Sequence, residues 1–357
     1  MSQPKVLFII PGFGTEMRGV ETHFESLSTR ITDKVDVHLL SKSHSRKLPS
    51  KIQNHMIKSF ERKNLDWIYR IPFLSRLLKR FFLSSSTEME AFLFCVKAIP
   101  FMLGNRFDII IPSAGFWTIC LAKFFGKSAK IMSIGHSGFV RKEARLSDFF
   151  VALTPNALEL ANQKLPDLDT EIIPNGVDIK RFQNFKKIGK EWDILSVGAF
   201  TPDKGHIDLL NALLQIPGSL NILLAGKGPL ERDLRNHDAF KRHNIQIKEF
   251  PFEEMPAVYN NAKIFTLASR EEAFGLVYLE ALSSGMNCVL NDIPNHRYVC
   301  GNIGFYCDVS NSKSYAEKLL EALKVDKNDL NRQQAEKFSW ESISGKYIGS
   351  MNRLLQR

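Results

Sequence analysis

Short runs of apolar, often β-branched residues alternate along the whole chain with longer segments whose apolar positions recur every three to four residues. In the first half, the runs predict strands at Val6–Ile10, Val35–Leu40, Asp108–Pro112, Lys130–Ile134 and Phe149–Thr154, with helices near Val20–Ile31, Glu88–Phe101 and Trp117–Phe125. In the second half, they predict strands at Asp193–Ala199, Asn221–Gly226, Gln246–Phe250, Lys263–Ser269, Asn287–Asn291 and Gly304–Cys307, with helices near His206–Gln215, Pro229–His237, Gly275–Ser284 and Ser314–Leu323. Strands that are apolar on both faces and joined by helices form parallel sheets. The pattern therefore predicts an α/β protein with two doubly wound parallel-sheet domains.

The division between these domains falls after the run Ile172–Asp178. The next segment, Ile179–Glu191, is polar and rich in lysine, which is typical of a linker. Phe338–Leu355 repeats apolar residues at helical spacing and predicts a terminal helix, and the polar stretch Asn331–Gln334 before it is a candidate crossing point between domains. We therefore expect an N-terminal domain at 1–178, a C-terminal domain at 179–337 and a final helix at 338–357.

Composition narrows the class of protein. With 357 residues, 44% of them apolar and 24% charged, the chain has enough apolar residues for two full cores, and disordered, collagen-like and coiled-coil classes are excluded. The longest apolar runs are far shorter than the roughly 20 residues of a membrane-spanning helix, and the N-terminus leads straight into a predicted strand, so we expect no secretory signal. The cysteines lack metal-site or redox-motif spacing and are typical of reduced thiols in the cytosol; they are Cys95, Cys120, Cys288, Cys300 and Cys307.

The positive charge is concentrated in one segment. Between Lys42 and Arg80 the chain has eleven basic and two acidic residues, which accounts for nearly all of its net charge of +10. Because the excess is local and does not cover a fold, we expect no nucleic-acid partner.

The strongest candidate for chemistry follows the predicted strand Lys263–Ser269. A helix predicted to begin at Gly275 would present the amides of Gly275, Leu276 and Val277 to an anion at the carboxyl end of the sheet. Glu280 would then lie within reach of a ribose diol, and Glu272 would face the group attached to the phosphate. The alternative is an ordinary helix start with two solvated glutamates.

Other strand ends of the same half carry similar signals. Lys204 follows the strand that ends in Val197-Gly198, where it could direct a cation at a ligand, and Gly226 and Gly228 form a glycine-rich turn after the next strand. Each signal alone is common in α/β proteins, and together they predict one site at one edge of the sheet.

The first half has two weaker candidates. Gly12, Gly14 and Gly19 follow the first predicted strand, but their spacing is not that of a dinucleotide-binding fingerprint. His136 follows another predicted strand and is flanked by glycines. A lone histidine is more often structural, but this position makes His136 a better candidate for a functional side chain than most.

Together these motifs resemble the retaining glycosyltransferases of the GT-B fold, specifically glycosyltransferase family 4, in which two Rossmann-like domains face each other across a cleft. The matching marks run from the first strand to the closing helix: Gly19-Val-Glu21, His136, Pro174–Asp178, Val197-Gly198 with Lys204-Gly205, Gly226–Pro229, Glu272 with Glu280, and Phe338–Glu341.

The resemblance implies a role for each matching position. Lys204 and the amides of Gly275 to Val277 would neutralise the donor diphosphate, with Gly14, Gly198, Gly226 and Gly228 letting backbone approach it. Glu280 would hold the ribose, Glu272 the transferred sugar, His136 the sugar near the reacting carbon, and Glu249 and Phe250 the base. No metal is implied, since the chain has no DxD-like carboxylate pair in a fitting place, and no cofactor is implied, since the nucleotide sugar is itself the donor substrate.

The chain departs from the family pattern at three positions. Ala199 stands where many relatives have an arginine, so Arg270 is the candidate for the missing cation, while Arg18 replaces a glycine and Tyr298 an acidic residue. The function implied is transfer of a hexose from a UDP- or GDP-linked sugar to a lipid, lipid-linked or saccharide acceptor. The alternatives are a nucleotide-sugar epimerase of the same fold and a non-catalytic subunit.

The basic segment Lys42–Leu83 bears on the acceptor, which the N-terminal domain selects in this family. In Phe73–Leu83, apolar residues occupy one half of a helical wheel and Arg76, Lys79 and Arg80 the other, with Trp67 and Tyr69 upstream. A basic amphipathic helix with aromatic residues is typical of a peripheral anchor on anionic lipid. The alternative is a helix whose apolar face lies on the core. We therefore expect a cytoplasmic protein, at the inner face of the cell membrane if the helix is an anchor.

Overall fold

The computed structural model describes residues 3–13, 19–43, 48–60, 64–80, 83–113, 115–136, 142–183 and 190–356. The chain forms two compact units, one of Met1–Pro174 with Ile343–Arg357 and the other of Asn175–Ser342. These boundaries lie within a few residues of those expected from the sequence.

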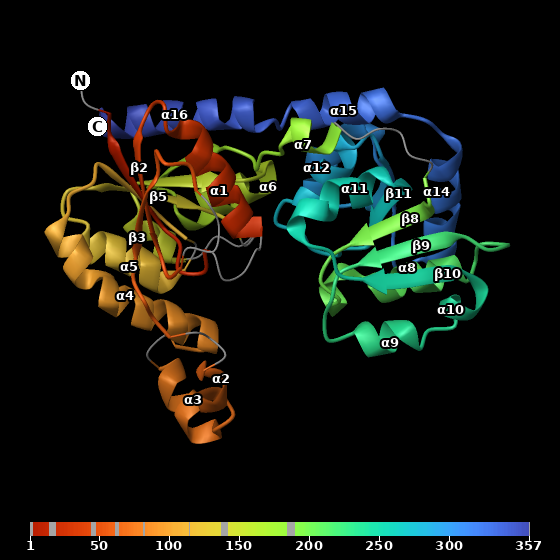
Figure 1. The fold of residues 1–357 in the computed structure, drawn as a ribbon, viewed down its shortest axis with the longest axis horizontal. Coiled ribbons are helices and arrows are strands. Elements are labelled where there is room, and N and C mark those ends of the chain that lie inside the picture. The colour runs from red at the N-terminus through yellow and green to blue at the C-terminus, as the bar shows by residue number, and fades with distance from the viewer. Residues whose placement is uncertain are drawn as a thin grey trace. The chain divides into compact units, whose positions relative to one another are not determined.

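The first unit is built on a parallel sheet. Its described strands are ordered β3-β2-β1-β4-β5-β6-β7, with bounds β1 Lys5–Ile9, β2 Asp36–Ser41, β3 Gln53–Met56, β4 Ile109–Pro112, β5 Lys130–Ile134, β6 Phe149–Ala152 and β7 Asp169–Ile172. The helices are α1 Gly19–Ile31, α2 Asp66–Tyr69, α3 Pro72–Lys79, α4 Ser86–Gly104, α5 Phe116–Phe125 and α6 Pro155–Lys164 (Figure 1). Strands β1 and β4 form the centre of the core because Val6–Ile9 and Ile109–Ile111 are fully buried.

The second unit repeats the plan. Its described strands are ordered β10-β9-β8-β11-β12-β13, all parallel, with bounds β8 Trp192–Val197, β9 Asn221–Ala225, β10 Asn244–Lys248, β11 Ala262–Leu267, β12 Asn287–Asn291 and β13 Phe305–Cys307. The helices are α7 Ile179–Gln183, α8 His206–Leu213, α9 Glu231–Arg235, α10 Ala239–Arg242, α11 Met255–Asn260, α12 Leu276–Ser283, α13 Pro294–Cys300, α14 Ser312–Lys324 and α15 Asn328–Glu336. Two parallel sheets with crossover helices confirm the predicted fold class.

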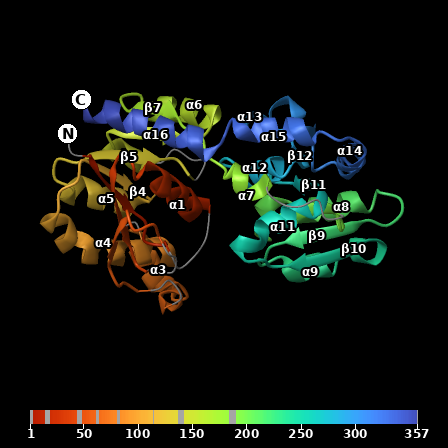
Figure 2. The same cartoon turned by 45° about the horizontal axis from the view of Figure 1, so that its top comes forward.

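The terminal helix α16, Trp340–Leu355, joins the first unit over most of its length. Its Tyr347 hydroxyl lies 3.3 Å from Nε2 of His23 in α1. The side chains of Ser350 and Arg353 both donate hydrogen bonds to Glu171 in β7. Figure 2 shows α16 running alongside β7 and α6.

The structure corrects the sequence prediction at several polar segments. Strands β3 (Gln-Asn-His-Met) and β7 (Asp-Thr-Glu-Ile) were not expected, because sheet-edge strands have no buried apolar run to reveal them. Part of the expected linker is helix α7, which buries Phe182, and the expected crossing point Asn331–Gln334 is wrong because it lies inside α15. There the buried Asn331 amide donates to the Gly285 carbonyl and to Asn287, so a polar side chain serves packing.

Candidate functional site

The second sheet changes direction between β8 and β11. These strands are neighbours although β9 and β10 come between them in the sequence, and the chain builds outward from them in both directions. The carboxyl ends of strands at such a switch point form the usual ligand site of open α/β sheets.

The turns after these two strands bring Lys204 and Glu272 together. The Lys204 Nζ donates to Oε2 of Glu272 at 2.8 Å, and the two side chains are only 22% and 15% exposed. Gly205 permits this approach, because it adopts φ +64° and a Cβ there would lie 2.2 Å from the Ala268 carbonyl oxygen. The sequence predicted both residues for one site, and their side chains do meet.

The glycines after β8 and β9 also meet. A Cβ on Gly226 would lie 2.0 Å from the Gly198 carbonyl oxygen, and one on Gly228 would lie 2.6 Å from the backbone of Phe200. Side chains at either position would push the two turns apart, so these residues are glycines for reasons of packing as well as access.

Helix α12 begins beside Glu272. Its N-cap residue Gly275 is left-handed at φ +87°, and no side chain caps the helix. The positive end of the helix dipole and the first amides, Leu276 and Val277, are therefore available to an anion.

Glu280 lies on the second turn of α12, where the Tyr259 hydroxyl donates to its Oε2 at 2.7 Å. Burial raises the pKa of this carboxyl to about 7, although the Tyr259 hydrogen bond and the Arg181 charge oppose the shift. Glu280 therefore changes charge in the neutral pH range, which a solvated glutamate does not.

Three predicted residues lie on the exposed parts of this edge. Arg270 donates two hydrogen bonds to Asp208 of α8, at 3.1 and 2.9 Å, so the cation is held there in the described structure. Glu249 pairs with Lys227 at 2.6 Å, and Phe250 has the Lys248 ammonium over its ring. Glu249 and Phe250 follow β10, two strands away from β8.

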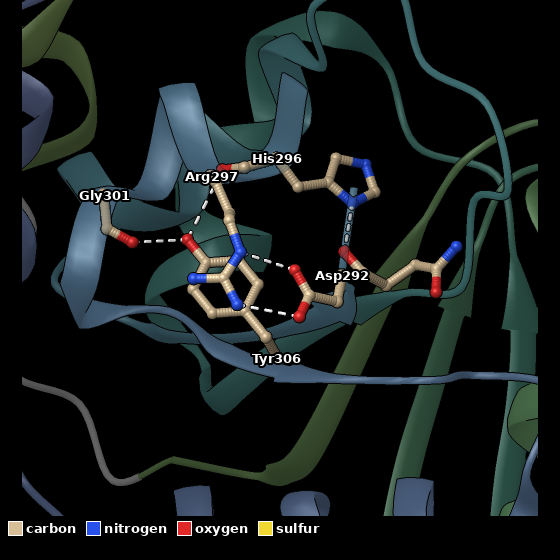
Figure 3. A network of polar contacts seen from close by, with 6 residues as sticks. Asp292, His296, Arg297, Gly301 and Tyr306 are labelled. Atoms are coloured by element: carbon tan, nitrogen blue, oxygen red, sulfur yellow. Dashed lines mark hydrogen bonds and ion pairs between the residues drawn. The ribbon is translucent and has the colours of Figure 1, made fainter. Parts of the chain in front are cut away.

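Asn295 and His296, in the first turn of α13 after β12, were not singled out from the sequence, yet Asn295 supports Glu272. The Asn295 amide donates to the backbone oxygen of Glu272 at 2.7 Å. His296 is fully buried, donates from Nδ1 to the Asn291 carbonyl at 2.8 Å, and packs edge-on against Tyr278. In Figure 3, Arg297 bridges to Asp292 in front of the Tyr306 ring, which fixes the start of α13. The available signal was the position of Asn291-Asp-Ile-Pro at the same sheet edge.

The first unit holds His136 just beyond β5. Its ring packs against His23 and Phe24, with centroids 4.7 and 5.4 Å away. Burial, with a smaller contribution from His23, holds the pKa of His136 well below its ordinary value, so the imidazole is neutral at pH 7. Gly14, the other candidate of this half, lies outside the described residues.

Helix α3 lies within the basic segment Lys42–Leu83. Arg76, Lys79 and Arg80 are exposed, as are Phe73 and Leu77, at 74% and 42%. The alternative that the apolar face lies on the core therefore does not hold for Phe73 and Leu77.

Among the described residues, no helix is long and apolar enough to cross a membrane. No group of three or more His, Cys, Asp or Glu side chains lies close enough to hold a metal ion in that part of the chain.

Comparisons with solved structures define the class of fold. Trehalose-6-phosphate synthase OtsA superposes with a TM-score of 0.77 at 11% identity, covering 98% of this chain and 99% of that one. A glycosyltransferase from Rickettsia africae superposes with a TM-score of 0.73 at 16% identity, covering all of both chains. The protein therefore has the GT-B fold.

The sequence comparisons add the activity class. Residues 178–338 match the family model described as glycosyl transferases group 1. The GDP-mannose:cellobiosyl-diphosphopolyprenol α-mannosyltransferase of Xanthomonas oryzae pv. oryzae is 26% identical over 217 residues, 56% of each chain. O-antigen chain mannosyltransferase B of Escherichia coli is 29% identical over 109 residues, 29% of each chain. The match with the Xanthomonas relative thus covers little more than half of that protein's length. Together the matches support a GT-B glycosyltransferase.

Proposed function

We propose that the protein is a retaining, metal-independent glycosyltransferase of family 4 that moves a hexose from a nucleoside diphosphate sugar to a lipid-linked or saccharide acceptor. The relatives named above are mannosyltransferases, and one uses GDP-mannose and a diphosphopolyprenol-linked acceptor. GDP-mannose is therefore the first donor to test, with UDP-linked hexoses as the alternative.

The observation that carries the proposal is the Lys204–Glu272 pair at the switch point, beside the uncapped start of α12. A diphosphate leaving group gains negative charge as the glycosidic bond breaks. A lysine and a helix N-terminus already in place stabilise that charge more in the transition state than in the ground state. Glu272, held through its backbone by Asn295, would accept hydroxyl hydrogen bonds from the sugar.

The remaining donor contacts follow from the same sheet edge. Glu280 as a carboxylate would accept hydrogen bonds from both ribose hydroxyls. Backbone at Glu249 and Phe250 would contact the base, and the close turns at Gly198 and Gly226 would leave room for the diphosphate. Arg270 would reach the diphosphate only by leaving Asp208.

The first unit would supply the acceptor side. A neutral His136 can hydrogen-bond a sugar hydroxyl near the reacting carbon without repelling an oxocarbenium-like transition state. The exposed apolar and basic residues of α3 would lie against anionic lipid, placing the protein at the inner face of the cell membrane. Neutralising Arg76, Lys79 and Arg80 together should reduce co-sedimentation with anionic vesicles, and unchanged sedimentation would remove this part of the proposal.

The test is release of free nucleoside diphosphate from GDP-, UDP- and ADP-hexoses, with and without lipid-linked saccharide. A transferase releases it in an acceptor-dependent way, an epimerase interconverts the sugars without releasing it, and a non-catalytic subunit does neither. Lys204→Met should abolish release. The matched control is Lys263→Met, because Lys263 pairs with Asp193 at 2.7 Å near the amino end of β11, at the opposite edge of the sheet.

A further inference from the structure

An apolar cavity of about 690 Å³ lies between α4 and α5 of the first unit. Helix α4 contributes Phe92 and Val96 to its wall, and α5 contributes Trp117 and Phe124. The one charged side chain among its described lining residues is Arg80, which directly follows α3. We call this cavity the α4–α5 groove.

The groove is open to solvent along apolar side chains. Val96 is 46% exposed and Phe124 is 70% exposed, while Cys95 and Leu121 beneath them are buried. Apolar surface gathered in a concave site of this size is typical of a ligand site and not of ordinary surface. A flat bilayer surface would not fill it, whereas a single hydrocarbon chain would.

Topology fixes the direction of the groove. Helix α5 begins just after β4, so Phe116 lies at the carboxyl edge of the sheet and Phe124 towards the amino edge. Helix α4 precedes β4 and ends near its amino end, so α4 begins at the carboxyl edge too. Figure 1 shows the two helices side by side, with α2 and α3 beyond the start of α4. The Arg80 end of the groove is therefore on the side of the sheet where His136 follows β5.

Charge is arranged along the same direction. Arg76, Lys79 and Arg80 are exposed at and just after the last turn of α3, and no described residue forms an ion pair with any of them. One end of the groove is thus cationic and the rest is hydrocarbon. A ligand that complements both parts has an anionic head and one apolar chain.

We propose that the α4–α5 groove binds the hydrocarbon chain of the lipid that carries the acceptor, a prenyl chain whose diphosphate lies at Arg80. The inference rests on the proposed function only in taking the acceptor to be lipid-linked. A chain in the groove would hold the attached saccharide at the sheet edge that carries His136.

Calorimetric binding of geranyl, farnesyl and geranylgeranyl diphosphate to the full chain tests this without any sugar donor. Affinity should rise by at least about tenfold from geranyl to farnesyl diphosphate, since each added isoprene unit buries further apolar surface. Inorganic diphosphate should bind far more weakly than any of the three. Equal affinity for the three chains, or for inorganic diphosphate, would overturn the proposal.

Variants locate the site. Val96→Trp fills the groove and should weaken farnesyl diphosphate binding at least tenfold, whereas Leu103→Trp, on an exposed position of the same helix outside the groove, should not. Phe124→Ser changes a mostly exposed wall residue, so it should fold normally and still lose the dependence on chain length. Arg80→Gln should weaken farnesyl diphosphate binding but leave farnesol binding unchanged.

Wild-type affinity for farnesyl diphosphate in both Val96→Trp and Phe124→Ser would show that the hydrocarbon does not bind in the groove, and would overturn the proposal. The binding experiment does not depend on sugar transfer. If the protein binds prenyl diphosphates in the groove but transfers no sugar, the proposed function alone is refuted; if it transfers sugar but its affinity does not depend on prenyl length, the groove proposal alone is refuted.

Discussion

Tyr259→Phe isolates the hydrogen bond from Tyr259 to Glu280, the carboxyl group whose pKa burial raises to about 7. The substitution removes only the hydroxyl that donates to Glu280 at 2.7 Å, and leaves a fully buried ring in place. Burial holds the pKa of the Tyr259 phenol well above its ordinary value, so the donor keeps its proton throughout the range of the experiment.

The size of the effect depends on the charge of Glu280. Above pH 7 the acceptor is a carboxylate, and a hydrogen bond to a charged group contributes about 1.5–3 kcal/mol; below pH 7 it is neutral, and the bond contributes about 0.5–1.5 kcal/mol. Tyr259→Phe should therefore lower the free energy of unfolding by about 1 kcal/mol more at pH 9 than at pH 5.5. By linkage this difference moves the Glu280 titration midpoint up by about one pH unit.

The direction of the pH dependence follows from the raised pKa. The folded protein holds the Glu280 proton up to about pH 7, while the unfolded chain releases it near 4.5. The contribution of this group to stability is therefore full below about 4.5 and is lost as the pH rises to 7. Glu280→Gln should remove that loss.

Urea unfolding at pH 5.5 and pH 9 measures these effects in wild type, Tyr259→Phe, Glu280→Gln and the double variant. Tyr278→Phe is the control, because its hydroxyl donates to the neutral Leu267 carbonyl at 3.0 Å and its loss should not depend on pH. An equal loss for Tyr259→Phe at both pH values, or a pH-dependent loss that persists beside Glu280→Gln, would refute the reasoning.

Three further predictions concern the second unit. Gly218→Ala should lower the free energy of unfolding by about 1–2 kcal/mol, since φ is +80° and no atom lies within 4 Å of the new methyl group. Gly205→Ala should lower it by at least about 2 kcal/mol more in urea unfolding, because its methyl group would meet the backbone of Ala268, just after β11. Affinity for the nucleotide sugar, whose diphosphate has no proton to release near neutral pH, should fall in calorimetry as the pH drops through about 7, and Glu280→Gln should remove that dependence; a slope that survives would show that Glu280 does not hold the ribose. Lys204→Met should weaken GDP or UDP binding about 10–100-fold but leave the nucleoside unaffected, and an equal loss for both would contradict a contact to the diphosphate.

Most of the second unit was predictable from its sequence, because the strands inside its sheet are buried on both faces. The run Asn287–Asn291 was predicted at its observed bounds, and β8, β9 and β11 within about two residues. The sequence predicted that Lys204 and Glu272 lie at the same edge of the sheet, since parallel strands place their carboxyl ends together. Polar segments gave no such signal, and β3, β7 and α15 were missed or misread for that reason.

The sequence by itself determined the class of fold, the order of the motifs and the sheet edge where they gather, because periodicity and turn residues are local properties of the chain. Only the tertiary structure decided the state of each group at that edge. In the folded protein Arg270 pairs with Asp208, and Asn295 donates a hydrogen bond to the backbone of Glu272. Burial beside Tyr259 raises the pKa of Glu280. Those properties depend on neighbours that are distant along the chain, and packing, which no local pattern records, brings those neighbours together.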